Sequence, residues 1–239
     1  MIALAFETST RASSVAIGWH DAGDGAPDHS ELRVASELLG EGAAHARDLL
    51  PTVERLLAEH GLSPRGITDV VVDLGPGSYT GLRVGVATAL GLAVGPDPPR
   101  LVGVSAPEVL FTDALEVGES GSWLLDGRSK AWYLARGRRV ASTIELTTPP
   151  ELLGEDELGA LVASLDPGER LLIDPTSAAK LAQQHPRLLA DRGPLDTRPI
   201  QPDVLLRAGL AHLAAEGPTP PGDLAPLYLR PFAAKVRKR

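Results

Sequence analysis

The sequence predicts an α/β fold built on a mixed β-sheet, and three patterns in its first half indicate it. Apolar runs over residues 2–6 and 13–19 flank a short polar turn, which is typical of a β-hairpin. An alternating segment over residues 31–39 follows a loop rich in Gly, Pro and Asp, and it predicts a third antiparallel strand. The apolar residues then change to helical spacing between Ala43 and Gly61, where glycine supplies a C-cap.

The elements that follow this helix complete a first unit. They are a buried strand at 69–74, a glycine-rich turn at 75–81, a helix at 82–94 and a strand at 101–104. Ser105 and Glu108 then predict a capping box at the start of a helix that runs to about Leu115. This order of elements predicts an N-terminal subdomain over residues 1–105.

The second half of the chain repeats this order less clearly. Its predicted elements are strands at 122–125, 131–135 and 170–174, helices at 158–165, 176–184 and 203–215, and a proline-rich loop near Pro149-Pro150. The segment 225–231 is edge-like, because its prolines cannot donate to a strand ladder, and a basic tail follows at 235–239. We interpret residues 106–239 as a degenerate second copy of the first unit, forming a C-terminal subdomain.

The composition excludes several classes of function. The 31 acidic and 23 basic residues give a formal charge of -8, so we do not expect the isolated chain to bind nucleic acid. The absence of cysteine excludes disulfides, cysteine-ligated zinc and a thiol nucleophile, and the six histidines lack the spacing of a catalytic zinc site. The sequence shows neither an export signal nor a stretch that could span a membrane, so we expect a soluble, cytoplasmic protein.

The turn between the buried strand and the second helix contains Gly75, Gly77, Ser78, Thr80 and Arg83. Free amides and the helix dipole at such a turn favour an anion. The spacing GxGxxxG is nevertheless one residue longer than the dinucleotide fingerprint, and no GxxxxGK[ST] motif occurs. The spacing therefore favours a structural strand–helix turn over a phosphate-binding loop.

Two carboxylates lie at strand ends. Glu7, followed by Thr8, ends the first strand, and Asp126 ends a later strand that corresponds to it if the chain is a duplication. Two carboxylates facing one cleft are what an ATP–Mg²⁺ site needs. A solvated turn residue is the simpler interpretation of each.

Small residues recur along the second helix at Gly81, Gly85 and Ala89, and again at Ala87 and Gly91. Each glycine inside a helix costs about 1 kcal/mol relative to alanine. Close approach of another backbone would offset that cost. On spacing alone, a segment of the same chain and a helix of a partner fit this pattern equally well.

Six sequence segments carry a family resemblance. They are AFETST, AAHARDLLPTVERLLAE, DLGPGSYTGLRVGVATALGLA and VGVSAPEVL in the first half, and LLDGRSKAWYLA and PLYLRP in the second. Together they resemble the TsaB (YeaZ) family. The resemblance implies an actin-like, hexokinase-type (ribonuclease H-like) duplicated fold, in which two subdomains hold mixed β-sheets flanked by helices.

The resemblance also implies a function, that of a non-catalytic scaffold and dimerisation subunit. Such a subunit binds the TsaD paralogue and supports threonylcarbamoyl transfer to adenosine 37 of tRNAs that read ANN codons. The implied partners are TsaD and the ATPase TsaE, with a homodimer when isolated and only indirect contact with tRNA. The chain is expected to have no cofactor of its own, with ATP or ADP and Mg²⁺ only at the interface with partner subunits.

The resemblance assigns two sets of residues. The partner interface comprises His45, Leu49, Val53, Gly81, Gly85 and Ala89. A vestigial nucleotide or phosphate loop comprises Glu7, Thr8, Gly75, Gly77, Ser78, Thr80, Arg83 and Asp126. The chain departs from the family where Glu7 replaces Asp, Tyr79 replaces Phe, and Ser129-Lys130 replace a Gly-Glu pair.

Two other functions stay open from the residues. One is an ATP-dependent phosphotransferase or acyltransferase with an actin-like fold, which would need a phosphate loop and two well-placed carboxylates. The other is a glycoprotease-type peptidase, for which the sequence offers no metal motif and no recognised nucleophile motif.

Overall fold

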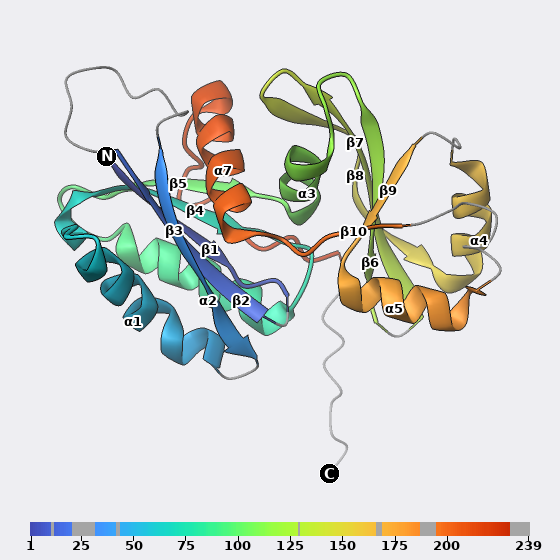
Figure 1. Ribbon diagram of the computed structural model, residues 1–239, viewed down its shortest axis with the longest axis horizontal. Coiled ribbons are helices and arrows are strands. Elements are labelled where there is room, and N and C mark those ends of the chain that lie inside the picture. The colour runs from blue at the N-terminus through green and yellow to red at the C-terminus, as the bar shows by residue number, and fades with distance from the viewer. Residues whose placement is uncertain are drawn as a thin grey trace, which may run out of the picture.

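The computed structural model describes residues 1–10, 12–20, 32–41, 44–128, 130–165, 169–186 and 195–229, without the side chains of residues 12, 40, 41 and 44–46. Two lobes lie side by side, each built on a five-stranded sheet (Figure 1). The first sheet has the order β3-β2-β1-β4-β5, and the second has the order β8-β7-β6-β9-β10. The strands of the first are β1 (Ile2–Glu7), β2 (Ala12–Trp19), β3 (Arg33–Glu41), β4 (Ile67–Asp73) and β5 (Arg100–Val104). Those of the second are β6 (Ser120–Asp126), β7 (Ala131–Val140), β8 (Thr143–Gly154), β9 (Arg170–Ile173) and β10 (Asp196–Thr197).

The two sheets share one topology, which confirms the predicted duplication. In each, the first three strands are antiparallel neighbours, and the fourth and fifth strands run parallel to the first. A helix follows the third, fourth and fifth strand of each unit. These helices are α1 (Ala44–Glu59), α2 (Tyr79–Leu92) and α3 (Ala106–Ala114), then α4 (Glu155–Ser164), α5 (Pro175–Gln184) and α7 (Pro202–Glu216), with a short 3-10 helix η2 (Pro64–Gly66) before β4.

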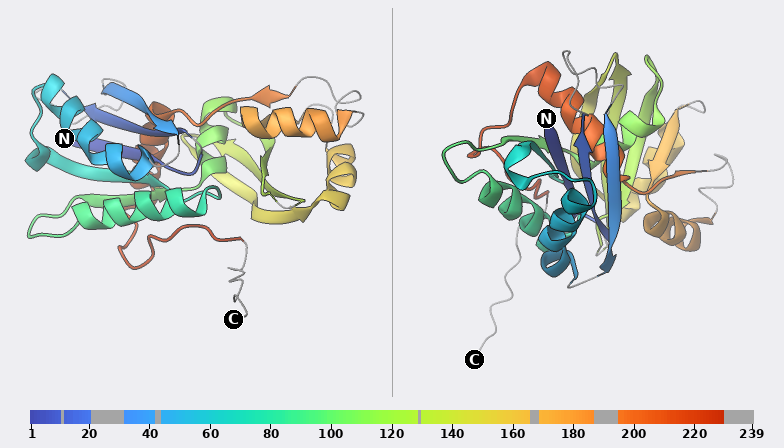
Figure 2. Two further views of the ribbon diagram at one scale, coloured as in Figure 1. Left: turned by 90° about the horizontal axis from the view of Figure 1, so that it is seen from below. Right: turned by 60° about the vertical axis from the view of Figure 1, so that its left-hand side comes forward.

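The central strand β1 buries both of its faces, as its unbroken apolar sequence predicts. Ala3 and Ala5 point to the face that α7 covers, where small side chains allow the helix to lie close to the sheet. Ile2, Leu4 and Phe6 point to the opposite face and pack with apolar residues of α1 and α2. Helices therefore cover the first sheet on both sides (Figure 2).

The last helix of each unit packs against the sheet of the other unit. Helix α7, which the sequence order places in the C-terminal subdomain as the helix at 203–215, lies on β1, β2, β4 and β5. Helix α3 packs on β7, β8 and β9 of the second sheet, and α3 and α7 contact each other between the lobes. This exchange of helices joins the two subdomains through buried apolar contacts.

Three arginines of the second subdomain bind the C-terminal end of α3. Arg139 donates from Nη1 to the carbonyl oxygens of Thr112 and Leu115, at 3.0 and 2.7 Å. Arg170 donates to the carbonyl of Ala114, and Arg198 donates to that of Asp113 at 3.3 Å. The last carbonyls of a helix lack partners within it and carry partial negative charge, so guanidinium groups stabilise this end.

The prediction of a proline-rich loop near Pro149-Pro150 is wrong, because both prolines lie in β8. This strand forms an edge of the second sheet, where a missing N–H is tolerated. The register with β7 also shifts here, since Leu134 pairs with Glu151 and Arg136 with Thr148. The two prolines thus lie opposite one residue of β7 and form a bulge. From composition alone, two adjacent prolines indicate a loop.

Residues 217–229 return to the first subdomain without forming a strand, so the edge-like segment expected at 225–231 is irregular in its described part. Thr219 N donates to Leu101 O at 2.8 Å, and Leu227 N donates to Leu74 O at 2.8 Å. Leu224 is 3% exposed and packs in the apolar core between the first sheet and helices α1 and α2. The basic tail at 235–239 lies outside the described residues. Within the described ranges, no helix has both the length and the apolar character needed to cross a membrane.

The contact between α7 and the first sheet generates a stability prediction. A Cβ added at Gly209 would lie 2.3 Å from Val71 Cγ1, so Gly209→Ala forces α7 or β4 to shift. We expect the free energy of unfolding to fall by about 1–3 kcal/mol. At Gly159 in α4 an added Cβ would meet no atom within 4 Å, so Gly159→Ala is expected to be neutral or stabilising by up to about 1 kcal/mol. Urea denaturation measures both, and equal effects would contradict the packing of α7.

Candidate functional site

Glu7 at the end of β1 closes the turn that follows it. Its side chain is 1% exposed. Oε1 accepts hydrogen bonds from Ser9 N at 2.8 Å, Ser9 Oγ at 2.9 Å and Thr10 N at 2.9 Å. Oε2 accepts one from Thr10 Oγ1 at 3.0 Å. Both carboxylate oxygens therefore accept hydrogen bonds from the turn of residues 8–10, which we call the β1 turn.

The glycines of the loop before α2 and of α2 itself face this β1 turn. A Cβ added at Gly77 would lie 2.5 Å from Ser9 O, and one at Gly81 would lie 1.9 Å from Thr8 O. At Gly85 it would lie 2.4 Å from Thr8 Oγ1. Only glycine permits such an approach, so α2 and the loop before it pack directly on Thr8 and Ser9 of the same chain.

The start of α2 also uses the β1 turn. Ser78 is the N-cap and accepts from Gly81 N at 3.3 Å, while its own N–H donates to Ser9 O at 2.7 Å. The helix begins at Tyr79, three residues before the start expected from the apolar pattern. The amide of Ser78, which the phosphate-loop interpretation needs for a ligand, is thus bound within the protein.

A second buried carboxyl lies beside Glu7 and was not singled out from the sequence. Asp73 ends β4, the parallel neighbour of β1, and Phe6 pairs with Val72 one position earlier. Asp73 Oδ1 accepts from Gly75 N at 2.7 Å, whereas Oδ2 has no hydrogen-bond partner. Because parallel strands end at one edge of a sheet, their terminal residues could have indicated this pair.

The pairing of these carboxyls changes their protonation. Burial and the nearby charge of Glu7 raise the pKa of Asp73 to about 7. Burial also raises the pKa of Glu7, against the lowering effect of its hydrogen bonds to Ser9 and Thr10. Two adjacent buried carboxyls disfavour double ionisation, so the pair retains a proton at pH values where exposed carboxyls are ionised.

Asp126 ends β6 and is the topological counterpart of Glu7 in the second subdomain. Lys180 of α5 donates to its Oδ1 at 2.5 Å, and Arg128 N donates to the same atom at 2.8 Å. The Lys180 ammonium also lies 5.2 Å from the ring centre of Trp132. Nothing in the sequence indicated Lys180, because it lies far from Asp126 along the chain. Lys130 is exposed in the adjoining turn.

The actin-like fold implies a nucleotide with Mg²⁺, and these residues do not fit one. Both oxygens of Glu7 accept hydrogen bonds from the β1 turn, Lys180 compensates the charge of Asp126, and Ser78 N donates to Ser9 O. The described ranges also contain no cluster of three or more His, Asp or Glu side chains that could hold a metal ion. Here the glycine-rich loop acts as a strand–helix turn.

The residues assigned to the partner interface mostly face the interior. Leu49 and Val53 are 1% and 4% exposed, Ala89 is 0% exposed, and Gly81 and Gly85 are buried. This corrects their placement on an outer surface, because α1 and α2 turn these positions toward their own sheet and the β1 turn. The outer face instead presents Leu50, Ala87 and Gly91. The side chain of His45 and all of Ser129 lie outside the described residues.

An exposed aromatic pair lies at the start of α2. Tyr79 and Tyr228 are 42% and 47% exposed, with ring centres 4.9 Å apart. Arg83, one turn along α2, donates to Tyr79 Oη at 3.1 Å, and its guanidinium lies 5.5 Å from the Tyr79 ring centre. Thr80 beside them is exposed. Thr80 and Arg83 thus belong to the surface, whereas Thr8 is fully buried and its Oγ1 has no hydrogen-bond partner.

Sequence comparison places this architecture among known proteins. A family model described as "TsaD: tRNA N6-adenosine threonylcarbamoyltransferase" matches residues 41–159. A tRNA threonylcarbamoyladenosine biosynthesis protein TsaB from Escherichia coli is 35% identical over 127 residues, covering 53% of this chain and 46% of the relative. The TsaB protein of Haemophilus influenzae is 38% identical over 135 residues, covering 56% and 52%. Over about half of its length, the chain is similar to proteins of the TsaB (YeaZ) family.

Solved structures support the fold of this chain. The structure of YeaZ from Pseudomonas aeruginosa superposes with a TM-score of 0.72 at 23% identity, covering 95% of this chain and 99% of that one. The shared fold and the duplicated sheet topology confirm the actin-like class predicted from sequence. The sequence matches to the TsaB relatives from E. coli and H. influenzae span about half of their length.

The buried carboxyl pair generates a pH prediction. The folded pKa of Asp73, about 7, lies above the ordinary value of 3.8, so its contribution to stability is complete below pH 4 and is lost as the pH rises toward 7. Asp73→Asn has no carboxyl to ionise at this position, so the variant does not lose this stability as the pH rises. Relative to the wild type, the variant should gain at most about 4 kcal/mol in unfolding free energy between pH 4 and 8.

Urea denaturation at a series of pH values measures this gain. The exposed Asp97 provides the control, and Asp97→Asn should follow the wild-type profile. Parallel profiles for the wild type and Asp73→Asn would show that the carboxyl is ionised in the folded protein.

Proposed function

We propose that this protein is a non-catalytic dimerisation subunit in tRNA threonylcarbamoyladenosine biosynthesis, working with a TsaD threonylcarbamoyltransferase. Relatives from E. coli and H. influenzae carry that biosynthetic name, and the matching family model is that of TsaD itself. TsaD and this chain would associate as paralogues of one fold. TsaE, ATP or ADP, and Mg²⁺ would act at the interface between the subunits, and tRNA would be held mainly by TsaD.

One observation supports an accessory role above the others. The β1 turn packs directly against the glycine-rich loop and accepts the Ser78 amide, a group that a phosphate-binding loop would offer to its ligand. The strand-end carboxylates of Glu7 and Asp126 also accept hydrogen bonds from residues of the same chain. A chain with this arrangement contributes surface rather than chemistry to a complex.

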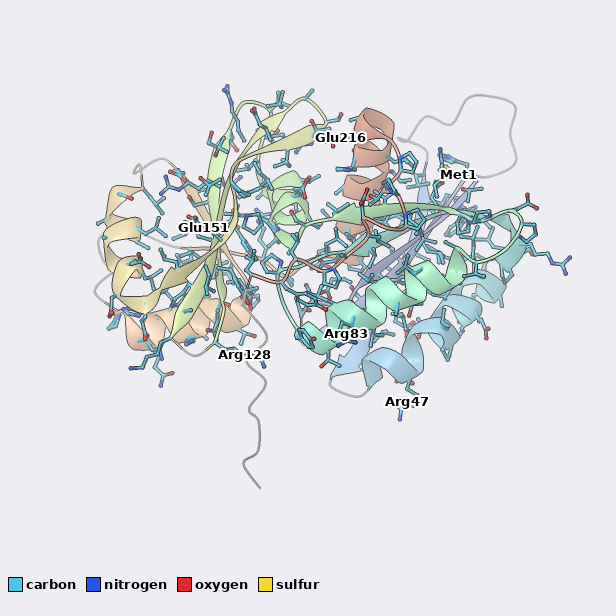
Figure 3. The ribbon with its side chains drawn as sticks, turned by 180° about the vertical axis from the view of Figure 1, so that it is seen from behind. Met1, Arg47, Arg83, Arg128, Glu151 and Glu216 are labelled. Atoms are coloured by element: carbon cyan, nitrogen blue, oxygen red, sulfur yellow. The ribbon has the colours of Figure 1, made fainter. Side chains whose placement is uncertain are left out.

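The outer side of α1 and α2 is the surface we assign to the partner. The two helices contact each other, and Figure 3 shows Arg47 projecting from α1 toward solvent. Ala87 and Gly91 are exposed four residues apart on α2, and Leu50 is 43% exposed on α1. Small side chains at this spacing allow a second pair of helices to approach closely. A specific interface of this kind buries on the order of 1,200–2,000 Å² in total.

Reconstitution tests the proposed function. The chain, TsaD and TsaE from one source are combined with ATP, bicarbonate, threonine, the enzyme that activates them, and an ANN-reading tRNA. We expect TsaD to co-elute with this chain. We also expect TsaD to form threonylcarbamoyladenosine only when this chain is present. Full activity of TsaD without the chain, or activity of the chain without TsaD, would refute the proposal.

The partner surface generates a prediction of its own. Ala87→Arg places a long charged side chain on the outer face of α2 and should weaken both the homodimer and the TsaD complex about tenfold or more, as truncation at an interface hot spot does. Ala163→Arg on the exposed face of α4 is the matched control and should leave both assemblies intact. Analytical ultracentrifugation measures the dissociation constants.

Circular dichroism is measured on the same variants, to distinguish substitutions that affect only a surface contact from substitutions that destabilise the fold. Ala87→Arg should keep the wild-type spectrum and melting temperature. Gly85→Leu, by contrast, drives a side chain into Thr8 and should lower the melting temperature sharply. If Ala87→Arg leaves both assemblies unchanged, the partner binds elsewhere.

A further inference from the structure

The buried carboxyls of Glu7 and Asp73 form a cluster that the proposed partner surface does not use. They end the parallel neighbours β1 and β4 and are 1% and 0% exposed. Asp73 Oδ2 has no hydrogen-bond partner, and Ser9 Oγ donates to Glu7 Oε1 at 2.9 Å. Two adjacent carboxyls shielded from water do not both ionise at low cost, so the pair retains a proton.

Among the described residues, no cation compensates this pair. Glu7 supplies the one charge that shifts the pKa of Asp73 in the part of the chain that the structure describes. Strand β2 has no charged side chain, and Arg100 of β5 donates to Asp69 Oδ1 at 2.7 Å. The other titratable or charged side chains on the described segments around the pair are Tyr79 and Arg83 of α2, Glu108 and Asp113 of α3, Asp203, Arg207, His212 and Glu216 of α7, and Asp223 and Tyr228 after α7.

The position of Glu7 determines the position of the β1 turn. Its two oxygens accept four hydrogen bonds from Ser9 and Thr10, at 2.8 to 3.0 Å. Thr8 is fully buried with its Oγ1 unpartnered, so it adds no side-chain hydrogen bond to the turn. The turn in its place receives α2, because Ser78 N donates to Ser9 O at 2.7 Å and the glycines of α2 pack on the turn. Displacement of Glu7 therefore releases the start of α2.

We propose that the Glu7–Asp73 pair is a pH-sensitive switch, which fixes the start of α2 while it holds a proton and releases it when both carboxyls are charged. Opening of the β1 turn exposes the pair to water, where a carboxyl ionises at its ordinary value. The pKa of Asp73 in the closed form is about 7, against 3.8 in water, and burial raises the pKa of Glu7 as well. Opening therefore releases a proton, and it becomes easier as the pH rises from about 4 to 7.

The switch links an internal charge to a helix that faces solvent. Helix α2 packs its glycines on the β1 turn and exposes Ala87 and Gly91 on its other side. A change of one proton inside the lobe therefore alters how firmly an outer helix is held at its start. The switch depends on contacts within the chain, so its failure and the failure of the proposed function are independent of each other.

Amide hydrogen exchange of the full-length chain, followed by NMR, tests the switch. The reporters are the amides of Ser78, which donates to Ser9 O, and Thr10, which donates to Glu7. Their protection, corrected for the intrinsic exchange rate at each pH, should fall about tenfold between pH 5.5 and 7.5. Low urea concentrations separate opening of the turn from unfolding of the whole chain, because local opening exposes little surface. Both amides should respond less to urea than that of Leu172 in β9.

Variants assign the effect to the pair. Asp73→Asn has one carboxyl fewer and should hold the protection of Ser78 within about twofold over this pH range. Glu7→Gln removes the charge beside Asp73, so its fall in protection should be smaller than that of the wild type. Asp97→Asn removes an exposed carboxyl and should follow the wild type.

The wild-type profile decides the proposal even where a variant fails to fold. Protection of Ser78 and Thr10 that does not change with pH would overturn the switch. A response to urea equal to that of Leu172 would also overturn it, because these amides would then exchange only by unfolding of the whole chain. An unchanged fall in Asp73→Asn would assign the pH dependence to another group and exclude the pair.

Discussion

The contact between the β1 turn and the glycines of α2 determines most of what this protein can do. Glu7 folds the turn by accepting hydrogen bonds from it at both carboxylate oxygens, and the turn then packs against the glycine-rich loop. Helix α2 must present Gly81 and Gly85 inward to accommodate it. The opposite side of α2 is thereby left to solvent. A single internal contact thus decides which side of α2 faces the protein interior and which side faces solvent.

Much of the fold could be predicted from sequence because its elements follow simple periodicities. The central strands are continuous apolar runs, and the caps at Gly61 and Ser105 mark helix ends. The errors arose where tertiary context overrides local pattern. Pro149 and Pro150 fit a strand only because β8 is an edge with a bulge opposite them. Small residues at two offsets on α2 gave no sign of which row faces inward, since that depends on the turn at Thr8.

The candidate site was less predictable because its partners are distant in sequence. The Asp126–Lys180 ion pair joins a strand end to a helix that follows three further strands. Asp73 and Glu7 become neighbours only through parallel pairing of β1 and β4. Tyr228 approaches Tyr79 because the chain returns along β5 after α7. Single residues at strand ends could be recognised from the sequence, whereas their charge balance required the sheet order.

The exchange of terminal helices between the lobes has a consequence for synthesis on the ribosome. Ala3 and Ala5 lie in the first strand that emerges, yet the helix that covers their face spans Pro202–Glu216. The first sheet can therefore bury only one side until almost the whole chain has been translated. Its uncovered face is an apolar surface of the kind that chaperones bind during translation. Duplication with exchanged helices thus couples completion of the first half of this protein to arrival of the last.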